Sequence, residues 1–181
     1  MFTRRGDTRE TDTALKKRVG KASPLVEFEG TLDEAISFIG NALVITRWDD
    51  VRQDLLAAQE DLYTLGEDVS AEGKARVIKP DRVEWLEQRS REYKAEIGRV
   101  RLFVVPGGTI EATSMHIART VTRRLERLAV YLSTEMEINR FVMIYLNRLS
   151  SLLFMTALVS NRRLGIEERI WDIRRESCQL P

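Results

Sequence analysis

The chain has 181 residues, enough for one domain with a sizeable core, and its 29 lysines and arginines against 28 aspartates and glutamates leave a net charge of +1. This balance argues against a general nucleic-acid binder, which carries a clear basic excess. The single cysteine, Cys178, excludes a disulfide framework or a cysteine-rich metal site within one chain. We find no apolar run of about 18 residues and no signal-peptide segment, so we expect a cytoplasmic protein without membrane contact.

The first 28 residues are polar and charged and have no helical period, which predicts a flexible N-terminal segment. We expect the helical domain to occupy residues 29–165 and a loose tail to occupy residues 166–181. The stretch "TLDE" at Thr31–Glu34 matches a capping box, which predicts that the first helix begins there.

Four further helices follow from apolar residues at helical spacing. The second begins near Asp50 and runs to Val69, and the third opens at Pro80, a favoured first-turn residue. Thr109 is placed to cap a fourth helix that extends to about Leu132. The fifth, from about Glu137 to Val159, is apolar around much of its circumference, as in a bundle centre or an oligomer interface. The pattern predicts an all-α, five-helix bundle.

The fourth predicted helix carries a row of arginines. Arg119, Arg123 and Arg127 are spaced i, i+4 and i+8, so their side chains share one stripe, and Arg124 lies roughly 100° round the helix. Guanidinium groups bind phosphate through paired hydrogen bonds and stay charged at any relevant pH. The spacing alone leaves two interpretations open, a solvated or salt-bridged face and a phosphate site.

A second basic motif lies at the N-terminus, where "TRRGD" spans Thr3–Asp7. A glycine flanked by a hydroxyl and two cations can wrap backbone amides around phosphates, although the motif is neither a P-loop nor a dinucleotide fingerprint. An ordinary flexible terminus is the alternative.

His116 is expected to be a packed helix residue, because no partner ligands cluster with it. Trp48, Trp85 and Trp171 are expected to be core or interface aromatics.

The motifs "TRRGD", "EGTLDEAISFIG", "FVVPGGT", "HIARTVTRRLER" and "NRLS" together resemble the PduO-type ATP:cob(I)alamin adenosyltransferases, in order and separation, over residues 3 to about 161. The resemblance implies a ferritin-like, five-helix subunit that assembles as a homotrimer. It also implies a reaction in which cob(I)alamin attacks the 5′ carbon of ATP, expels triphosphate and becomes adenosylcobalamin, with Mg²⁺ at the phosphates.

The resemblance also implies site residues. Asp33 and Arg119 match a pair that joins adjacent subunits beside the site, Arg123 acts on the triphosphate, and Phe103 matches an aromatic residue beneath the corrin that excludes the lower axial ligand. Glu126 matches the magnesium end of the site. The positions that match the family's ATP site are Thr3, Arg4, Arg5, Gly6, Thr11, Asp12, Lys21, Arg123, Arg124, Glu126, Arg127 and Asn147.

Two positions depart from the family pattern. Arg9 stands where the loop T-R-x-G-D-x-G-x-T has its second glycine, and an arginine adopts positive φ less freely. Ser151 follows "NRLS" where an acidic residue is common, which affects the corrin side of the expected site.

Two other functions are consistent with parts of the pattern. A non-catalytic bundle that binds ATP or polyphosphate would explain the altered loop, and a basic-helix nucleic-acid module would explain the arginine row alone. The adenosyltransferase reading makes ATP and a reduced corrinoid the substrates. It also implies a reductase that supplies electrons and a cobalamin-dependent mutase that receives the product.

Overall fold

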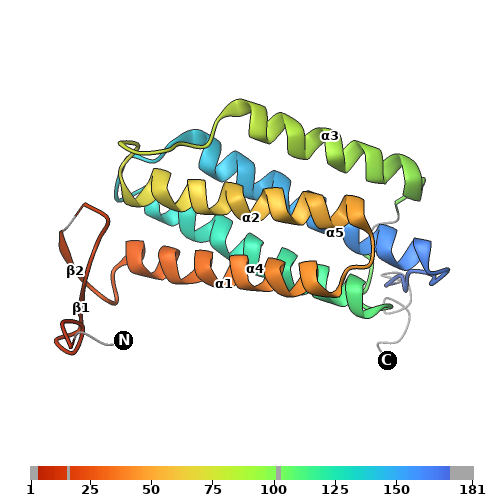
Figure 1. Ribbon diagram of the computed structural model, residues 1–181, viewed down its shortest axis with the longest axis horizontal. Helices are drawn as coiled ribbons and strands as arrows, with labels where there is room; N and C mark the ends of the chain where they lie inside the picture. The colour runs from red at the N-terminus through yellow and green to blue at the C-terminus, as the bar shows by residue number, and fades with distance from the viewer. Residues whose placement is uncertain (1–3, 16, 101–102, 172–181) are drawn as a thin grey trace, which may run out of the picture.

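The computed structural model describes residues 4–15, 17–100 and 103–171. It contains five long helices and a short two-stranded hairpin that precedes them (Figure 1). The elements are β1 (Glu10–Asp12), β2 (Arg18–Gly20), α1 (Pro24–Ile45), α2 (Asp49–Ser70), α3 (Pro80–Ile97), α4 (Ile110–Leu132) and α5 (Arg140–Arg163).

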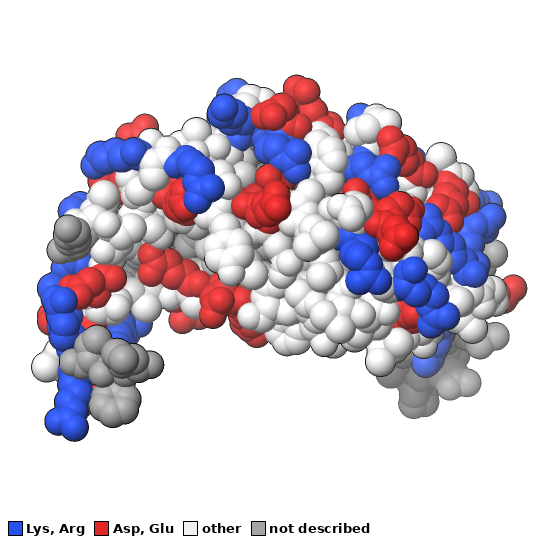
Figure 2. Space-filling model, in the orientation of Figure 1, with Lys and Arg blue, Asp and Glu red and all other residues white. Residues whose placement is uncertain are grey.

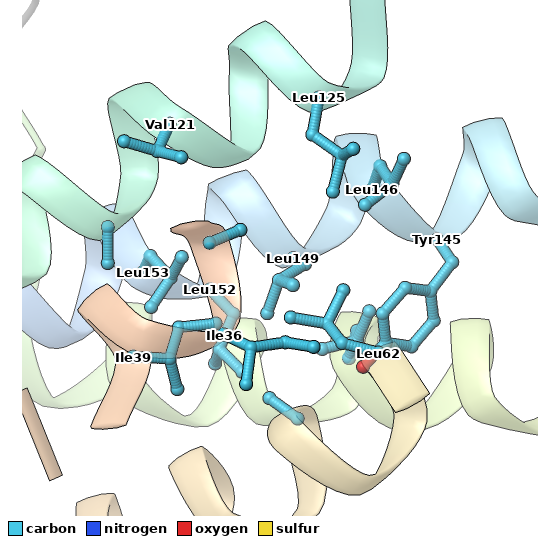
Figure 3. Close-up of a cluster of buried hydrophobic side chains, with 14 of the residues drawn as sticks. Ile36, Ile39, Leu62, Val121, Leu125, Tyr145, Leu146, Leu149, Leu152 and Leu153 are labelled. Carbon is cyan, nitrogen blue, oxygen red and sulfur yellow. The ribbon is translucent and has the colours of Figure 1, made fainter. Parts of the chain in front are cut away.

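The helices form one bundle around a continuous apolar core. α4 packs against both α1 and α5, α3 packs on α5, and α2 packs on α1. Figure 3 shows how this core interlocks, with Ile36 and Ile39 from α1 and Leu62 from α2 meeting Val121 and Leu125 from α4 and a run of leucines from α5. α5 buries residues around most of its circumference, as its composition predicted.

α1 begins a full two turns earlier than the capping box predicted. Ser23 is its N-cap and accepts a hydrogen bond from the Val26 N–H (3.5 Å), and Pro24 follows in the first turn. Thr31 lies inside the helix and is only 5% exposed, so the predicted start at Thr31 is wrong. The polar residues next to Thr31 lie on the exposed face of a helix that begins at Pro24.

The other helix starts agree closely with the sequence. Pro80 opens α3, and the Thr109 hydroxyl accepts a hydrogen bond from the Ala112 N–H (3.1 Å) at the start of α4. α5 starts slightly later than predicted because Asn139 caps it through the Phe141 N–H (3.0 Å). It also continues to Arg163, beyond the predicted end.

A ladder of aspartates fixes α2 against α3 and α5. Asp54 accepts hydrogen bonds from the Arg89 guanidinium (2.9 Å) and the Tyr93 hydroxyl (2.6 Å). Because the ladder repeats every seventh residue, these bonds hold the register of the three helices along α2. The remaining contacts are Asp61 with Arg82 and Tyr145, and Asp68 with the Ile78 N–H and Asn139.

The connector between α3 and α4 pairs with the segment that follows α5. Val104 forms a β-bridge with Ile170, and the Trp171 N–H donates to the Phe103 carbonyl (2.9 Å). The part of the expected tail that the structure describes is therefore attached to the bundle. Cys178 lies outside the described residues.

α5 is long and apolar enough to cross a membrane by length and composition, so the expectation of no apolar run of that length is wrong. However, 61% of its most apolar window is buried inside the bundle. Such burial is typical of the core helix of a bundle.

Candidate active site

The N-terminal loop folds around Arg18 of β2. The Arg18 guanidinium donates to the Arg5 carbonyl (3.1 Å) and to the Thr8 hydroxyl (3.3 Å), and Arg5 forms an ion pair with Asp12 (3.2 Å). Thr11 lies in β1, opposite Val19. The segment thus forms a turn followed by a short hairpin. Thr3 lies outside the described residues.

Gly6 and Lys21, which both match the family's ATP site, lie close together. A Cβ atom added to Gly6 would stand 2.9 Å from the Lys21 Nζ atom, so a side chain at position 6 would displace the lysine. The glycine therefore lets the ammonium lie directly against the loop. Figure 2 shows that lysines and arginines gather on this hairpin where it projects from the body of the molecule.

Arg4 and Arg9 have positive φ angles of 60° and 66°. Arg9 therefore adopts the left-handed conformation, which glycine reaches most freely. Its carbonyl accepts a hydrogen bond from the Lys21 N–H (2.9 Å), which holds the loop against the second strand. Arg9 therefore adds a cation to a loop whose backbone is left-handed at this position.

Helix α4 presents the arginine row. Arg123 and Arg127 are exposed, and neither makes an ion pair with any residue that the structure describes. Arg124 differs, because it pairs with Glu34 on α1. The arginines of this row therefore differ in charge balance. Arg124 is neutralised by Glu34, whereas Arg123 and Arg127 keep an unbalanced positive charge that can bind an anion.

Glu126 and Asn147 meet between α4 and α5. The Asn147 amide donates to a Glu126 carboxylate oxygen (2.9 Å), and Arg148 donates to the Asn147 Oδ1 atom (2.6 Å). No cluster of three or more acidic, histidine or cysteine side chains that would hold a metal exists among the described residues. One carboxylate suffices for Mg²⁺ when substrate phosphates and water complete its octahedron, so Glu126 fits that ion.

A shallow cavity of about 280 Å³ lies beside the arginine row and is lined by Arg119, Arg123, Ser150, Ser151, Phe154 and Met155. The Arg119 guanidinium lies over the Phe154 ring, 5.8 Å from its centroid. Burial and the neighbouring Arg123 lower the pKa of Arg119, as expected for a cation short of anionic partners.

Asp33 is exposed on α1, and no ion pair joins it to Arg119 within the chain.

Phe103 has a φ of 59° and is 59% exposed on the α3–α4 connector. Its ring therefore takes no part in the core of a single chain. Figure 1 places this connector and the β1–β2 hairpin at opposite ends of the bundle.

Sequence reasoning missed several neighbours of these residues. No sequence motif marks Phe154 and Met155, which line the cavity, and the Glu34 partner of Arg124 lies 90 residues away in the chain. The Lys17–Glu72 ion pair (2.8 Å), which ties the hairpin to the end of α2, is likewise a tertiary contact. Local spacing carries no signal for any of these contacts.

The bundle and its basic loop and helix define a helical protein built to bind a polyphosphate. The chain belongs to the cobalamin adenosyltransferase family, whose sequence pattern it matches over residues 1–160. The predicted family and the predicted five-helix fold are therefore confirmed.

Individual relatives agree over nearly the whole chain. A cobalamin adenosyltransferase of Cupriavidus metallidurans is 40% identical over 180 residues, which cover 98% of this chain and 96% of that protein. A corrinoid adenosyltransferase of Bacillus subtilis is 40% identical over 172 residues, covering 92% and 89%. The structure of a variant PduO-type ATP:corrinoid adenosyltransferase from Lactobacillus reuteri, complexed with cobalamin and ATP, matches with a TM-score of 0.90 at 29% identity, covering 96% of this chain and 97% of that chain.

Proposed function

We propose that this protein transfers the 5′-deoxyadenosyl group of ATP to a Co(I) corrinoid. The cobalt electron pair forms a Co–C bond to the 5′ carbon, and the electrons of the breaking C–O bond leave with triphosphate. The observation that carries the proposal is that Arg123 and Arg127, beside the Glu126–Asn147 contact, form no ion pair with any described residue. Fixed cations placed where negative charge develops stabilise such a transition state.

The nucleotide is proposed to bind between the basic loop and the arginine row. Arg4, Arg5, Gly6 and Lys21 supply backbone amides and cations to the phosphates, and Arg123 and Arg127 receive the departing triphosphate. Thr3, Thr11, Asp12, Arg124 and Asn147 complete the proposed set. For Arg124 to reach ATP, its ion pair with Glu34 has to open, so its contribution is smaller than that of Arg123.

Mg²⁺ is proposed to bind at Glu126, with phosphate oxygens and water as its other ligands. The Asn147 amide donates to the same carboxylate and fixes its orientation (2.9 Å). Bound there, the ion would neutralise charge on the triphosphate.

Phe103 is proposed to lie beneath the corrin ring. Its exposure in the single chain and its place on a connector support a contact with a ligand over a role in the core. An apolar ring at the lower face keeps water and the dimethylbenzimidazole base off cobalt. Without that ligand, an added electron enters a lower-lying d orbital, so reduction to Co(I) becomes accessible to biological donors.

A homotrimer is proposed as the active assembly, with Asp33 of one chain paired with Arg119 of the next. Two features support it. The loop and the Phe103 connector lie at opposite ends of one chain (Figure 1), and neither Asp33 nor Arg119 has an ion-pair partner among its own chain's described residues. A site that needs both the loop and the connector is completed by two chains.

A cytoplasmic location is part of the same proposal, as are a reductase that delivers electrons and a mutase that accepts the product. Burial of most of α5 in the bundle supports a protein that does not span a membrane.

The test is anaerobic incubation with ATP, Mg²⁺ and chemically reduced cobalamin. The proposal predicts the spectrum of a light-sensitive Co–C product. ATP binding with an unchanged cobalamin spectrum would favour the non-catalytic ATP-binding bundle. Tight nucleic-acid binding with a steep dependence on salt would favour the basic-helix module.

A further inference from the structure

His116 lies inside α4, one turn before Arg119. It is 3% exposed, and it is the only histidine of the chain. Its Nδ1 atom accepts a hydrogen bond from the Arg119 Nε–H (3.4 Å). Its Nε2 atom is enclosed and has no hydrogen-bond partner among the described residues.

This arrangement requires a neutral ring with its proton on Nε2, because Nδ1 is occupied as an acceptor. Burial, followed by the charge of Arg119, lowers the pKa of His116 to about 4, so the ring is neutral at neutral pH. The Nε2–H group is then a buried donor without an acceptor, which is rare in folded proteins and destabilising. A leucine would fill similar space without that penalty, so packing alone does not account for a histidine here.

The His116 ring and the Arg119 guanidinium both lie against the ring of Phe154, to which His116 is tilted by 52°. The centroids of His116 and Phe154 are 6.0 Å apart, and the Arg119 guanidinium carbon lies 5.8 Å from the centroid of the same phenyl ring. Within the described residues, Arg119 donates a hydrogen bond only through its Nε–H, so its two Nη groups have no protein partner there. Arg119 also lines the cavity together with Arg123, Ser150 and Ser151.

We propose that His116 is a positioning residue, which fixes the Arg119 guanidinium over Phe154 and presents its Nη groups at the cavity wall. The inference rests on the proposed function, which gives Arg119 its role beside the reacting groups. Arg123 lies one turn further along the same stripe, and its charge would push an unsupported Arg119 out of this position. The acceptor at Nδ1 opposes that displacement.

Two substitutions separate positioning from packing. Asparagine shares the first side-chain atoms of histidine, and its Oδ1 atom falls near the place of Nδ1, so His116→Asn keeps the acceptor. His116→Leu keeps the apolar volume and removes both the acceptor and the unpaired donor. We expect His116→Leu to melt no lower than the wild type and to lose about tenfold in kcat, the usual scale for one hydrogen bond to a charged group. His116→Asn should keep most of the turnover.

Equal kcat values for the two variants would overturn the proposal. So would a His116→Leu protein that melts well below the wild type and loses activity in proportion, because His116 would then be an ordinary packing residue.

A second measurement needs no activity and no substituted histidine. Since the chain has one histidine, the ring ¹⁵N signals in its NMR spectrum are unambiguous. We expect the neutral Nε2–H tautomer at pH 7, and a shift of the Nδ1 resonance in Arg119→Met, which removes the donor and keeps an apolar stem. An Nδ1–H tautomer, or an Nδ1 resonance that Arg119→Met leaves unchanged, would refute the positioning role and leave the proposed adenosyl transfer standing. Absence of a Co–C product from the wild-type protein would instead refute the proposed function.

Discussion

At the scale of single residues, Arg9 combines a strained backbone with a useful charge. A residue with a Cβ atom costs roughly 1–2 kcal/mol in the left-handed region, and Arg9 occupies it with a φ of 66°. The loop therefore has a conformation that glycine adopts freely, and Arg9 places one more guanidinium near the proposed phosphates.

Arg9→Gly and Arg9→Ala both remove the guanidinium and differ only in backbone freedom. We expect Arg9→Gly to bind ATP more tightly than Arg9→Ala, by about five- to tenfold if most of the strain appears in binding. Titration calorimetry with Mg-ATP measures the difference. Equal dissociation constants would mean that the loop does not need its left-handed residue when nucleotide binds.

Phe103 provides a second test at this scale. Because its side chain is 59% exposed, we expect Phe103→Ala to change the free energy of unfolding little while turnover falls. Bound cob(II)alamin should remain five-coordinate in the electron paramagnetic resonance spectrum of the variant. A loss of about 3–5 kcal/mol in urea unfolding, the usual result for a buried Phe→Ala, would make Phe103 a core residue.

At the scale of elements, the hairpin is tied to the bundle by charges. Lys17 contacts Glu72 at the end of α2 (2.8 Å), and Lys74 contacts the same carboxylate (2.9 Å). Lys17 and then Lys74 lower the pKa of Glu72 to about 2. An unfolded glutamate titrates near ~4.3, so this contribution is complete above that pH and is lost as the pH falls through about 2.

Glu72→Gln should release the hairpin without disturbing the bundle. We expect faster tryptic cleavage at Arg4, Arg5 and Arg9 at neutral pH, and a smaller protective effect of added Mg-ATP. Glu67→Gln is the matched control, because Glu67 pairs with Arg76 on the same α2–α3 connection and not with the hairpin. Equal cleavage rates in the two variants would show that the Lys17–Glu72 pair does not hold the loop.

The sequence predicted the helices better than the hairpin. Apolar spacing located all five helices, and Thr109 and Pro80 marked two of their starts, because those signals are local. Ser23 and Pro24 form an equally local start signal, whereas the "TLDE" pattern predicts a later start that the structure does not have. The strands Glu10–Asp12 and Arg18–Gly20 are short and polar and have no buried face, so no alternation revealed them.

For the candidate site, the sequence indicates individual positions, whereas their contacts depend on how the helices pack. Helical spacing indicated the arginine row, and the family pattern indicated Gly6, Lys21, Glu126 and Asn147 as separate positions. Their contacts, Gly6 with Lys21 and Glu126 with Asn147, come from the structure. The Arg124–Glu34 pair, the His116–Arg119 contact and the Asn161 side chain that accepts from the Thr109 N–H (2.9 Å) depend on helix packing. No local pattern encodes them.

At the scale of the whole molecule, a site shared between chains makes a quantitative prediction. Lys21→Ala damages the ATP side and Phe103→Ala damages the cobalt side, and the two segments lie at opposite ends of one chain (Figure 1). In a closed ring of three chains, every mixed trimer contains one junction at which both sides are wild type, so activity should recover to about one third.

The two variants are co-expressed with different tags and purified through both. The double variant Lys21→Ala/Phe103→Ala, co-expressed with Phe103→Ala, is the control and should remain inactive, since none of its junctions is intact. Failure of the two tags to co-purify, or co-purification without recovery, would contradict a site built from adjacent chains.

In the proposed reaction, the chain moves the adenosyl group of ATP onto cobalt and releases the three phosphates as one unit. The most direct measurement is a single anaerobic turnover with excess enzyme, in which triphosphate and the light-sensitive Co–C product are quantified together. Adenosyl transfer to cobalt predicts equal amounts of the two products, with triphosphate release dependent on Co(I). Release of phosphate or diphosphate from ATP without a Co–C bond would contradict it.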